Sequence, residues 1–314
     1  KKFILEYIIM NHKNIAIFGS TGHVAKNLIS FFSKDKTFDL FLFSRDPTKS
    51  QTLSSPHKFS FRSYDEFEKN EYDVIINCIG VNVAKFTNYD PFHLIISEFY
   101  DNKIINYLKN HSTTLYLNLS SGAIFGQDFI SPVNDFSIPK LDLNEVNQGT
   151  LYSSSKIYSE FKHRSFVDFN IVDLRIFGFF SKFIDLNTNF FMSELIKSVK
   201  NKSNFITNND DIIRDYVNPS DFYNLVKCCI SNKKINDAFD VYSKEPISKF
   251  QILKEFSDKF DLKFKLIEKL QSISETGLKK NYYSLSRKAK KIDYFPQFSS
   301  LETILNESAL ILKI

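Results

Sequence analysis

Short apolar strands alternate with amphipathic helices from Asn14 to about Val172. The predicted strands comprise residues 15–18, 39–43, 74–79, 114–119 and 170–175, and the predicted helices comprise residues 24–33, 98–110 and 152–167. Alternation of this kind implies parallel βαβ units, with helices on both faces of one sheet. In such folds the ligand crevice lies at the carboxyl ends of the strands. We therefore expect an α/β fold with a doubly wound parallel sheet.

Composition excludes several classes of protein. The net charge of +5 is small for 314 residues, and the basic residues are scattered, whereas nucleic-acid binding needs a concentrated basic stripe. The three cysteines form neither a disulfide framework nor a metal-ligand pattern, which indicates a reducing compartment. No apolar segment reaches the roughly 18 residues of a membrane span. The start, residues 1–10, superficially resembles a signal peptide, but Glu6 interrupts its apolar run and no small-residue cleavage site follows. We expect a cytoplasmic protein without metal, nucleic-acid or membrane partners.

A glycine-rich loop follows the first predicted strand and precedes the first predicted helix. Gly19 permits a tight turn, Gly22 lets the backbone approach a pyrophosphate, and the small Ala25 allows the helix to pack near the strand. The helix N-terminus would supply free amides to the phosphates. The alternative is an ordinary strand-to-helix turn. We expect a Rossmann-type dinucleotide site whose loop contacts are Gly19, Ser20, Thr21, Gly22, His23 and Val24, with no catalytic role for His23.

Two further strand ends would line the cofactor. At the end of the second strand, Ser44 stands where an acidic residue would pair with the adenosine ribose, and Arg45 follows, a planar cation suited to a 2′-phosphate. This favours NADP(H) over NAD(H), although Asp46 could still serve ribose binding. On the cofactor's far side we expect Cys78, Ile79 and Gly80, with Cys78 as a buried filler rather than a nucleophile.

Tyr152 and Lys156, four residues apart, face the same way on a predicted helix. A free phenol titrates near pH ~10, too high for easy proton exchange with a substrate hydroxyl. A neighbouring ammonium favours the phenolate, so the pair can supply a proton donor that works near neutral pH. Such a pair also occurs by chance on many helices. Ser121, at the end of an earlier strand, adds a hydroxyl that can hydrogen-bond a substrate carbonyl.

In this order and spacing, the glycine loop, Ser121 and the Tyr152/Lys156 pair resemble the extended short-chain dehydrogenase/reductase superfamily. More narrowly, the chain resembles the NAD(P)-dependent epimerase/dehydratase family that acts on nucleotide sugars, over essentially its whole length. Segments 173–177, 214–217, 220–221 and 239–242 match later parts of the family pattern. The resemblance implies a Rossmann domain over residues 11–175 with the catalytic residues. It also implies a smaller C-terminal α/β substrate-binding lobe over 176–314, from which some segments return to the sheet.

The resemblance also implies roles for individual residues. Tyr152 would be the general acid/base, Lys156 would activate it and hold the nicotinamide ribose, and Ser121 would polarise the reacting oxygen. Arg214 would contact the nucleotide diphosphate, where a planar cation can bind in a bidentate manner. The alternative for Arg214 is a surface ion pair with Asp215 or Asp211.

Three departures from the family pattern narrow the reaction. Gly122 and Ala123 replace the carboxyl-bearing residues of 4,6-dehydratases, which argues against dehydration. No cysteine lies near Ser121 for the proton shuffling of the combined epimerase/reductases. Gly178 stands where the family often has an asparagine that touches the substrate phosphate, so part of that contact is lost or supplied elsewhere.

Simple hydride chemistry at one carbon remains. The leading hypothesis is reduction of a 4-keto (deoxy)sugar nucleotide, for surface polysaccharide biosynthesis. The alternative is a 4-epimerase or C4 dehydrogenase with tightly bound NAD, and a third possibility is a non-catalytic dinucleotide-binding scaffold or sensor. By resemblance we also expect a homodimer, to which Ile157, Phe161 and Phe166 of the Tyr152 helix could contribute, unless these three side chains belong to the core.

Overall fold

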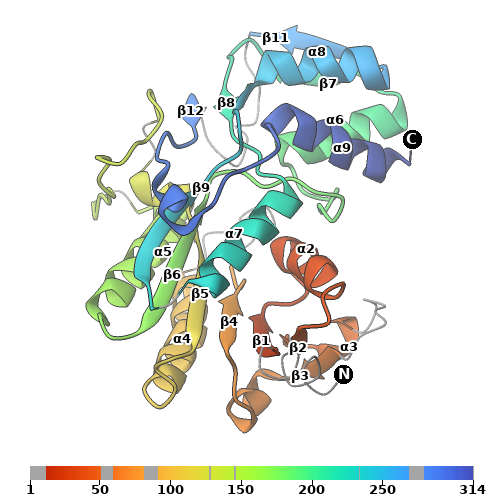
Figure 1. Ribbon diagram of the computed structural model, residues 1–314. Helices are drawn as coiled ribbons and strands as arrows, with labels where there is room; N and C mark the ends of the chain where they lie inside the picture. The colour runs from red at the N-terminus through yellow and green to blue at the C-terminus, as the bar shows by residue number, and fades with distance from the viewer. Residues whose placement is uncertain are drawn as a thin grey trace.

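The computed structural model describes residues 12–50, 59–80, 91–126, 129–144, 146–232, 234–268 and 279–313. Its centre is a seven-stranded sheet in the order β3-β2-β1-β4-β5-β6-β9, in which every neighbouring pair is parallel (Figure 1). The strands are β1 (Lys13–Phe18), β2 (Phe38–Phe43), β3 (Phe59–Arg62), β4 (Val74–Asn77), β5 (Leu115–Ser121), β6 (Asn170–Ile176) and β9 (Asn236–Val241). The order reverses at β1, so the predicted doubly wound Rossmann-type sheet is confirmed.

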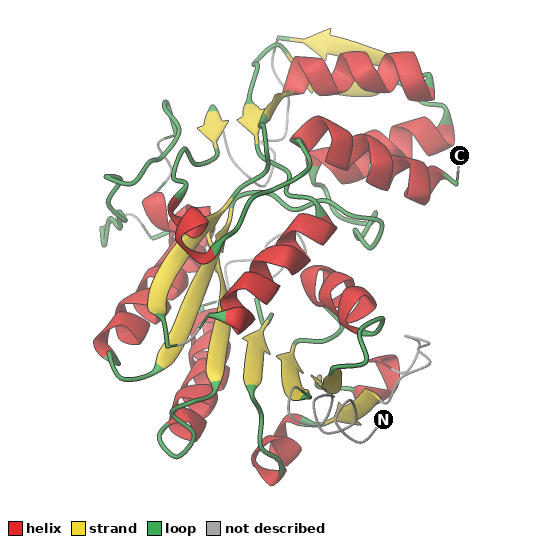
Figure 2. Cartoon of the chain, in the orientation of Figure 1, coloured by secondary structure: helices red, strands yellow, loops and turns green. Residues whose placement is uncertain are grey.

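Helices cover both faces of this sheet (Figure 2). Alternate residues of β1 explain the two layers, because Ile15 and Ile17 face one core and Ala16 and Phe18 the other. The first core includes α2 (His23–Phe32) and α7 (Pro219–Ser231), and the second includes α4 (Phe92–Leu108), which packs beside α5 (Gln148–Ser165). Within the described ranges, no helix combines the length and the apolar character needed to cross a bilayer.

A separate layer lies beyond the carboxyl ends of the strands, at the upper right of Figure 1. It contains α6 (Phe191–Asn201), α8 (Lys249–Phe260) and α9 (Ser300–Leu312), with the two-stranded sheet of β7 (Phe205–Asn208) and β11 (Phe264–Ile267). Its own core is apolar and includes Phe180, Leu195 and Phe256. Because this core is distinct from the two that flank the large sheet, the layer is a small lobe.

A three-stranded sheet of very short strands connects the lobe to the end of β5. It has the order β10-β8-β12, formed by β10 (Ile247–Ser248), β8 (Ile213–Arg214) and β12 (Asn281–Tyr282). Tyr282 pairs in register with Arg214. Tyr282 also joins a small core with Phe177 and with residues of η3 (Gly122–Phe125), the 3₁₀ turn that begins directly after Ser121. This pairing brings Arg214 and Tyr282 to the predicted catalytic serine.

The predicted elements are present, with shifts at their ends. Helix α5 begins four residues before the predicted start, because Asn147 caps it by accepting from the amides of Gly149 and Thr150. Tyr152 therefore lies in its second turn rather than at its start. Strand β4 ends at Asn77, so Cys78 and Ile79 follow the strand instead of belonging to it. Elements that we did not predict are α3 (Pro47–Ser50), η1 (Tyr64–Lys69), η4 (Lys288–Ile292), β3, the short strands β7, β8 and β10–β12, and α9.

Candidate active site

The glycine loop has the geometry of a phosphate-binding turn. Gly19 adopts φ +69°, and a Cβ there would lie 3.0 Å from the Cys78 carbonyl group. A Cβ on Gly22 would lie 3.1 Å from the Gly19 carbonyl oxygen. Gly22 precedes α2 without a side-chain cap, so no side chain covers the first amides of that helix. These are features of a loop that binds a pyrophosphate, and the cofactor contacts of its residues stay a prediction.

His23 connects the glycine loop to the chain after β6. Its Nε2 lies 2.7 Å from the Ser181 Oγ, and its ring packs edge-on against Phe179. Burial, together with the charge of Lys26, lowers the pKa of His23 to about 4. The imidazole is therefore neutral at physiological pH, and its polar edge is directed to Ser181.

The end of β2 lies beside the glycine loop, because Phe43 pairs with Phe18 in register. Ser44 is buried there, and Arg45 is exposed. Burial raises the pKa of two phenols here, Tyr64 and Tyr100. The nearby charge of Arg45 opposes part of that rise. The Tyr64 hydroxyl accepts a hydrogen bond from the Gly19 amide at 3.2 Å. The predicted adenosine end of the site thus contains an aromatic pair that the sequence analysis did not identify.

The segment after β4 crosses directly over the glycine loop. The Cys78 amide donates to the Phe18 carbonyl at 3.0 Å, and the Ile79 amide donates to the Asn77 side chain at 3.0 Å. Gly80 is exposed. Burial raises the pKa of the Cys78 thiol to about 12, with a smaller opposing effect from Lys156. The thiol is therefore protonated near neutral pH, although Cys78 is half-buried rather than fully buried as predicted.

The three predicted catalytic residues converge at the end of β5. Ser121 is its last residue and is 7% exposed, and η3 immediately after it packs against α5. Lys156 is buried and donates from Nζ to the Leu119 carbonyl at 2.7 Å. The same ammonium lies 5.9 Å from the centre of the Tyr152 ring. Among the described residues, β5 takes one of the three Lys156 donors, and the other two are available to a ligand.

Two buried cations lie next to this group. Arg214 is 6% exposed and donates through Nη1 to the carbonyls of Ile213 and Lys279, while its buried Nη2 has no partner among the described residues. Lys279 is 8% exposed, and its ammonium lies 4.5 Å from the centre of the Tyr282 ring and 5.3 Å from that of Phe129. Burial, and then the charge of Arg214, lowers the pKa of Lys279 to about 8.

Carboxylates do not neutralise these two cations in the part of the chain that the structure describes. Asp215 accepts instead from Ser243 and Ser300, and Asp211 accepts from the Phe250 amide. The alternative of a surface ion pair for Arg214 is therefore wrong. Two buried, unneutralised cations form a site suited to an anion.

Two glycines near the site permit close packing. A Cβ on Gly122 would lie 2.4 Å from the Phe177 ring, and a Cβ on Gly178 would lie 2.4 Å from the Asp215 carbonyl oxygen. The Gly178 carbonyl also accepts from the Val217 amide. Gly178, which we predicted beside the substrate, thus lies where the chain after β6 meets the segment after β8.

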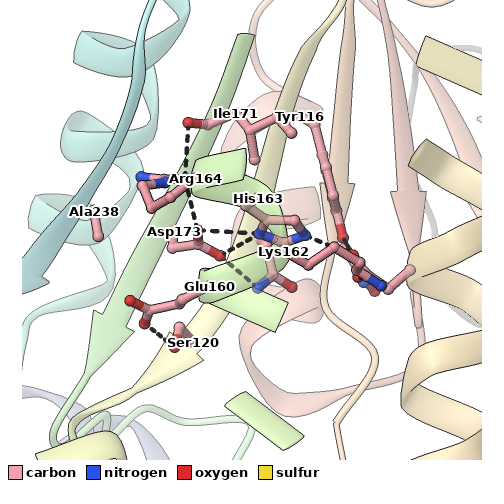
Figure 3. A network of polar contacts seen from close by, with 12 residues as sticks. Tyr116, Ser120, Glu160, Lys162, His163, Arg164, Ile171, Asp173 and Ala238 are labelled. Carbon is pink, nitrogen blue, oxygen red and sulfur yellow. Dashed lines mark hydrogen bonds and ion pairs between the residues drawn. The ribbon is translucent and has the colours of Figure 1, made fainter. Parts of the chain in front are cut away.

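A buried polar network fixes α5 against the sheet (Figure 3). Glu160, one turn after Lys156, accepts from the Ser120 hydroxyl at 2.5 Å and pairs with Arg175 at 2.6 Å. One turn further on, His163 lies between two buried carboxylates, Asp101 and Asp173, each 2.9 Å away. Ser120 is the neighbour of Ser121, so the network holds the helix of Tyr152 and the strand of Ser121 in one register.

Besides Tyr64 and Tyr100, three residues near Ser121 were not predicted from the sequence: Lys279, Tyr282 and Phe129. Tyr282 reaches the site through a two-residue strand, which leaves no periodic signal. Lys279 belongs to an ordinary pair of lysines in the sequence, and only its burial distinguishes it.

Comparison with known proteins agrees with this geometry. The model of the NAD dependent epimerase/dehydratase family matches residues 15–243. A search of curated proteins found no matching sequence. Among solved structures, UDP-N-acetylglucosamine 4-epimerase from Methanobrevibacter ruminantium M1, in complex with UDP-N-acetylmuramic acid, has a TM-score of 0.81 at 14% identity, over 97% of this chain and 99% of that chain.

Two other solved structures have the same fold. UDP-glucuronic acid 4-epimerase from Bacillus cereus, in complex with UDP-glucuronic acid and NAD, has a TM-score of 0.78 at 14% identity, over 96% of this chain and 99% of that chain. dTDP-glucose 4,6-dehydratase from Bacillus anthracis, in complex with NAD, has a TM-score of 0.77 at 8% identity, over 96% of this chain and 97% of that chain. At these identities the similarity establishes the fold alone. The family match covers more than half of the chain, and the chain therefore belongs to the NAD dependent epimerase/dehydratase family, whose members are enzymes of the extended short-chain dehydrogenase/reductase type.

Proposed function

We propose that this enzyme interconverts a carbonyl and an alcohol at one carbon of a nucleotide-activated sugar, and that its forward reaction is the reduction of a 4-keto sugar nucleotide. The observation that carries the proposal is the convergence of Ser121, Tyr152 and Lys156 beside the glycine loop, with the Arg214/Lys279 cation pair next to them. Residues 11–175 would hold the cofactor and the catalytic groups, and most of 176–314 would hold the substrate.

The glycine loop fits a nicotinamide dinucleotide, because Gly19 makes its turn with a positive φ and Gly22 places no side-chain cap on the first amides of α2, which can then bind phosphate. When bound, the cofactor supplies or accepts a hydride. In the reductive direction Tyr152 gives its proton to the carbonyl oxygen as hydride reaches the carbon. The Lys156 ammonium, held at the Leu119 carbonyl, supports the tyrosine and can donate to a ribose hydroxyl. Ser121 donates a hydrogen bond to the same substrate oxygen.

The substrate proposal rests on charge. A nucleotide diphosphate diester carries two negative charges, which match the two buried cations of the site. The Arg214 Nη2, which is buried and has no partner among the described residues, would gain one there. Phosphate oxygens would also replace part of the water that the Lys279 ammonium loses on burial. The Tyr282 ring lies between these cations and Ser121, so an anion bound to them brings an attached sugar towards the catalytic residues.

The direction of the reaction follows from the cofactor. The exposed Arg45 beside the buried Ser44 favours NADP(H), and a phosphorylated cofactor favours net reduction. The second candidate is a 4-epimerase or C4 dehydrogenase with retained NAD. It is favoured by the names of the family and of two of the solved relatives, which are 4-epimerases.

Dehydration is not proposed. A 4,6-dehydratase would need carboxyl-bearing side chains at positions 122 and 123, by the family pattern. Gly122 has no room for one, because its Cβ would already overlap the Phe177 ring at 2.4 Å.

We also propose a homodimer, formed by α4 and α5. Large apolar side chains on α4 are exposed, among them Ile95 (59%) and Phe99 (62%), and on α5 Phe161 is 74% exposed. Of the positions that we first considered on α5, Ile157 and Phe166 instead pack against the core. Burying an apolar face of this kind against a second copy yields roughly 25 cal/mol per Å² of apolar surface.

Mass spectrometry of the purified protein, followed by turnover assays, tests the function. We expect consumption of NADPH with 4-keto-6-deoxy sugars of UDP or dTDP. Stoichiometric NAD with C4 inversion and no added cofactor would favour the epimerase instead. If no nucleotide sugar reacts with either cofactor, the scaffold alternative replaces both.

A further inference from the structure

Ser121 has little hydrogen-bonding capacity to spare. A serine hydroxyl has one hydrogen and two acceptor lone pairs. The Ala123 amide donates to the Ser121 Oγ at 3.2 Å. The Tyr282 hydroxyl lies 3.4 Å from the same oxygen, on the side of the small lobe. If both groups donate, they occupy both lone pairs of the Ser121 oxygen. Ser121 can then bind a further group only by donating its own hydrogen.

Tyr282 is held rigidly in this position. Its ring packs edge-on against Phe129 at 4.7 Å and lies tilted against Phe177 at 5.3 Å, and β12 fixes its backbone beside Arg214. The side chain is 6% exposed. Burial raises the pKa of Tyr282 well above its usual value, with only small opposing effects from Ser121 and Arg214. The phenol therefore keeps its proton at any pH at which the enzyme works.

The direction of the contact follows from acidity. A phenol is a far stronger hydrogen-bond donor than an aliphatic hydroxyl, and the rigid ring allows its O–H only a rotation about the C–O bond. The O–O distance of 3.4 Å is longer than the usual ~2.7–2.8 Å. Hydrogen bonds of catalytic groups are often long in the free enzyme and shorten when substrate closes the site.

We propose that Tyr282 is a positioning residue that acts through Ser121. Its hydroxyl donates to the Ser121 Oγ, so that the single hydrogen of Ser121 is directed to the substrate oxygen. Ser121 then works as a donor only, which favours a carbonyl oxygen, or the negative charge that develops on it, over a hydroxyl that must itself donate. Polarisation along the Tyr282–Ser121–substrate chain strengthens the last hydrogen bond. The inference rests on the proposed function, because it assigns Ser121 to the reacting oxygen.

The test is a double-mutant cycle of Tyr282→Phe and Ser121→Ala. Tyr282→Phe keeps the ring, its packing and its contacts with Lys279 and Arg214, and it removes only the hydroxyl. We expect kcat to fall by about 3- to 10-fold, the size of one hydrogen bond, with the KM for nucleotide sugar and cofactor unchanged. In the Ser121→Ala background the same change should alter kcat by less than about twofold.

The adjacent Tyr283→Phe is the matched control, because it removes the same hydroxyl from a half-buried neighbouring tyrosine for which the described residues show no contact with Ser121. It should leave kcat unchanged. An equal loss from Tyr282→Phe in both backgrounds would overturn the proposal, since Tyr282 would then act independently of Ser121. If Ser121→Ala is too slow to measure, a rise in KM without a fall in kcat for Tyr282→Phe overturns it as well. Failure of the proposed function would look different, because the unmodified enzyme would then turn over no nucleotide sugar.

Discussion

Replacing Lys279 by methionine should make the protein more stable while weakening its substrate site. The drop in the pKa of Lys279 from 10.5 to about 8 means that folding penalises the charged amine by about 3 kcal/mol, at ~1.4 kcal/mol per pH unit. Contact of the ammonium with the rings of Tyr282 and Phe129 offsets about 1 kcal/mol. Methionine fills a similar volume without a charge. We expect Lys279→Met to raise the free energy of unfolding by about 2 kcal/mol at pH 7.

The pH dependence of this stability difference shows whether the charge on Lys279 causes it. Below pH 8 the amine is charged in both the folded and the unfolded chain, so the full penalty is present. As the pH rises from 8 towards 10.5, the folded protein loses the proton first, and the unmodified protein gains stability. In urea unfolding at constant ionic strength, the advantage of Lys279→Met should therefore shrink to about 1 kcal/mol at pH 9.5 and approach zero only above pH 10.5.

Lys280→Met, at the exposed neighbouring lysine, is the control and should change stability by less than about 0.5 kcal/mol. In the same variants, Lys279→Met should weaken the binding of UDP or dTDP by about tenfold or more, and Lys280→Met should not. A Lys279→Met variant that is less stable than the unmodified protein by the same amount at pH 7 and pH 9.5 would refute the reasoning. Lys279 would then make a stabilising contact in the folded protein instead of being an unneutralised cation that binds an anion.

Three further outcomes follow from the same geometry. Tyr152→Phe should lower kcat by at least about 100-fold while calorimetric affinities for cofactor and nucleotide stay within about twofold, and a smaller effect on kcat would remove Tyr152 from proton transfer. Gly122→Ala should cost about 1–3 kcal/mol in urea unfolding, because its Cβ would overlap the Phe177 ring; an unchanged midpoint would mean that the ring moves freely. Burial alone would lower the pKa of His163, but Asp173 and Asp101 raise that pKa to about 9. The stability that protonated His163 contributes is therefore complete below pH 6.5 and is lost as the pH rises through 9. His163→Gln should flatten that part of the stability profile, and an unaltered slope would contradict the assignment.

The parts of the site that sequence could predict are those with local signals. Gly19 and Gly22 stand between a strand and a helix, and Tyr152 and Lys156 are one helical turn apart, so short-range pattern suffices for both. The parallel order of the sheet followed from the alternation of its elements. Helix α9 was missed although its start carries a usable signal, the capping box of Ser299 and Glu302.

Other parts depend on contacts between distant segments. Strand β12 has two residues, and its partner β8 lies far away in the sequence, so neither periodicity nor turn chemistry indicates that Tyr282 meets Arg214. Strand β3 alternates apolar and polar residues, but it has only four of them, which is the lower limit at which such alternation predicts a strand. His23 also looks like a loop residue in sequence, and only the return of the chain after β6 gives it Ser181 as a partner.

The most direct test of the central claim is to follow the hydride itself. A 4-keto nucleotide sugar is incubated with NADPH that carries deuterium at the transferred position of the nicotinamide, and the product is weighed by mass spectrometry. We expect a product with one non-exchangeable deuterium at the former carbonyl carbon, formed at least about 100-fold more slowly by the Tyr152→Phe variant. A product that has lost water, or one that gains no deuterium while turnover proceeds, would contradict this expectation.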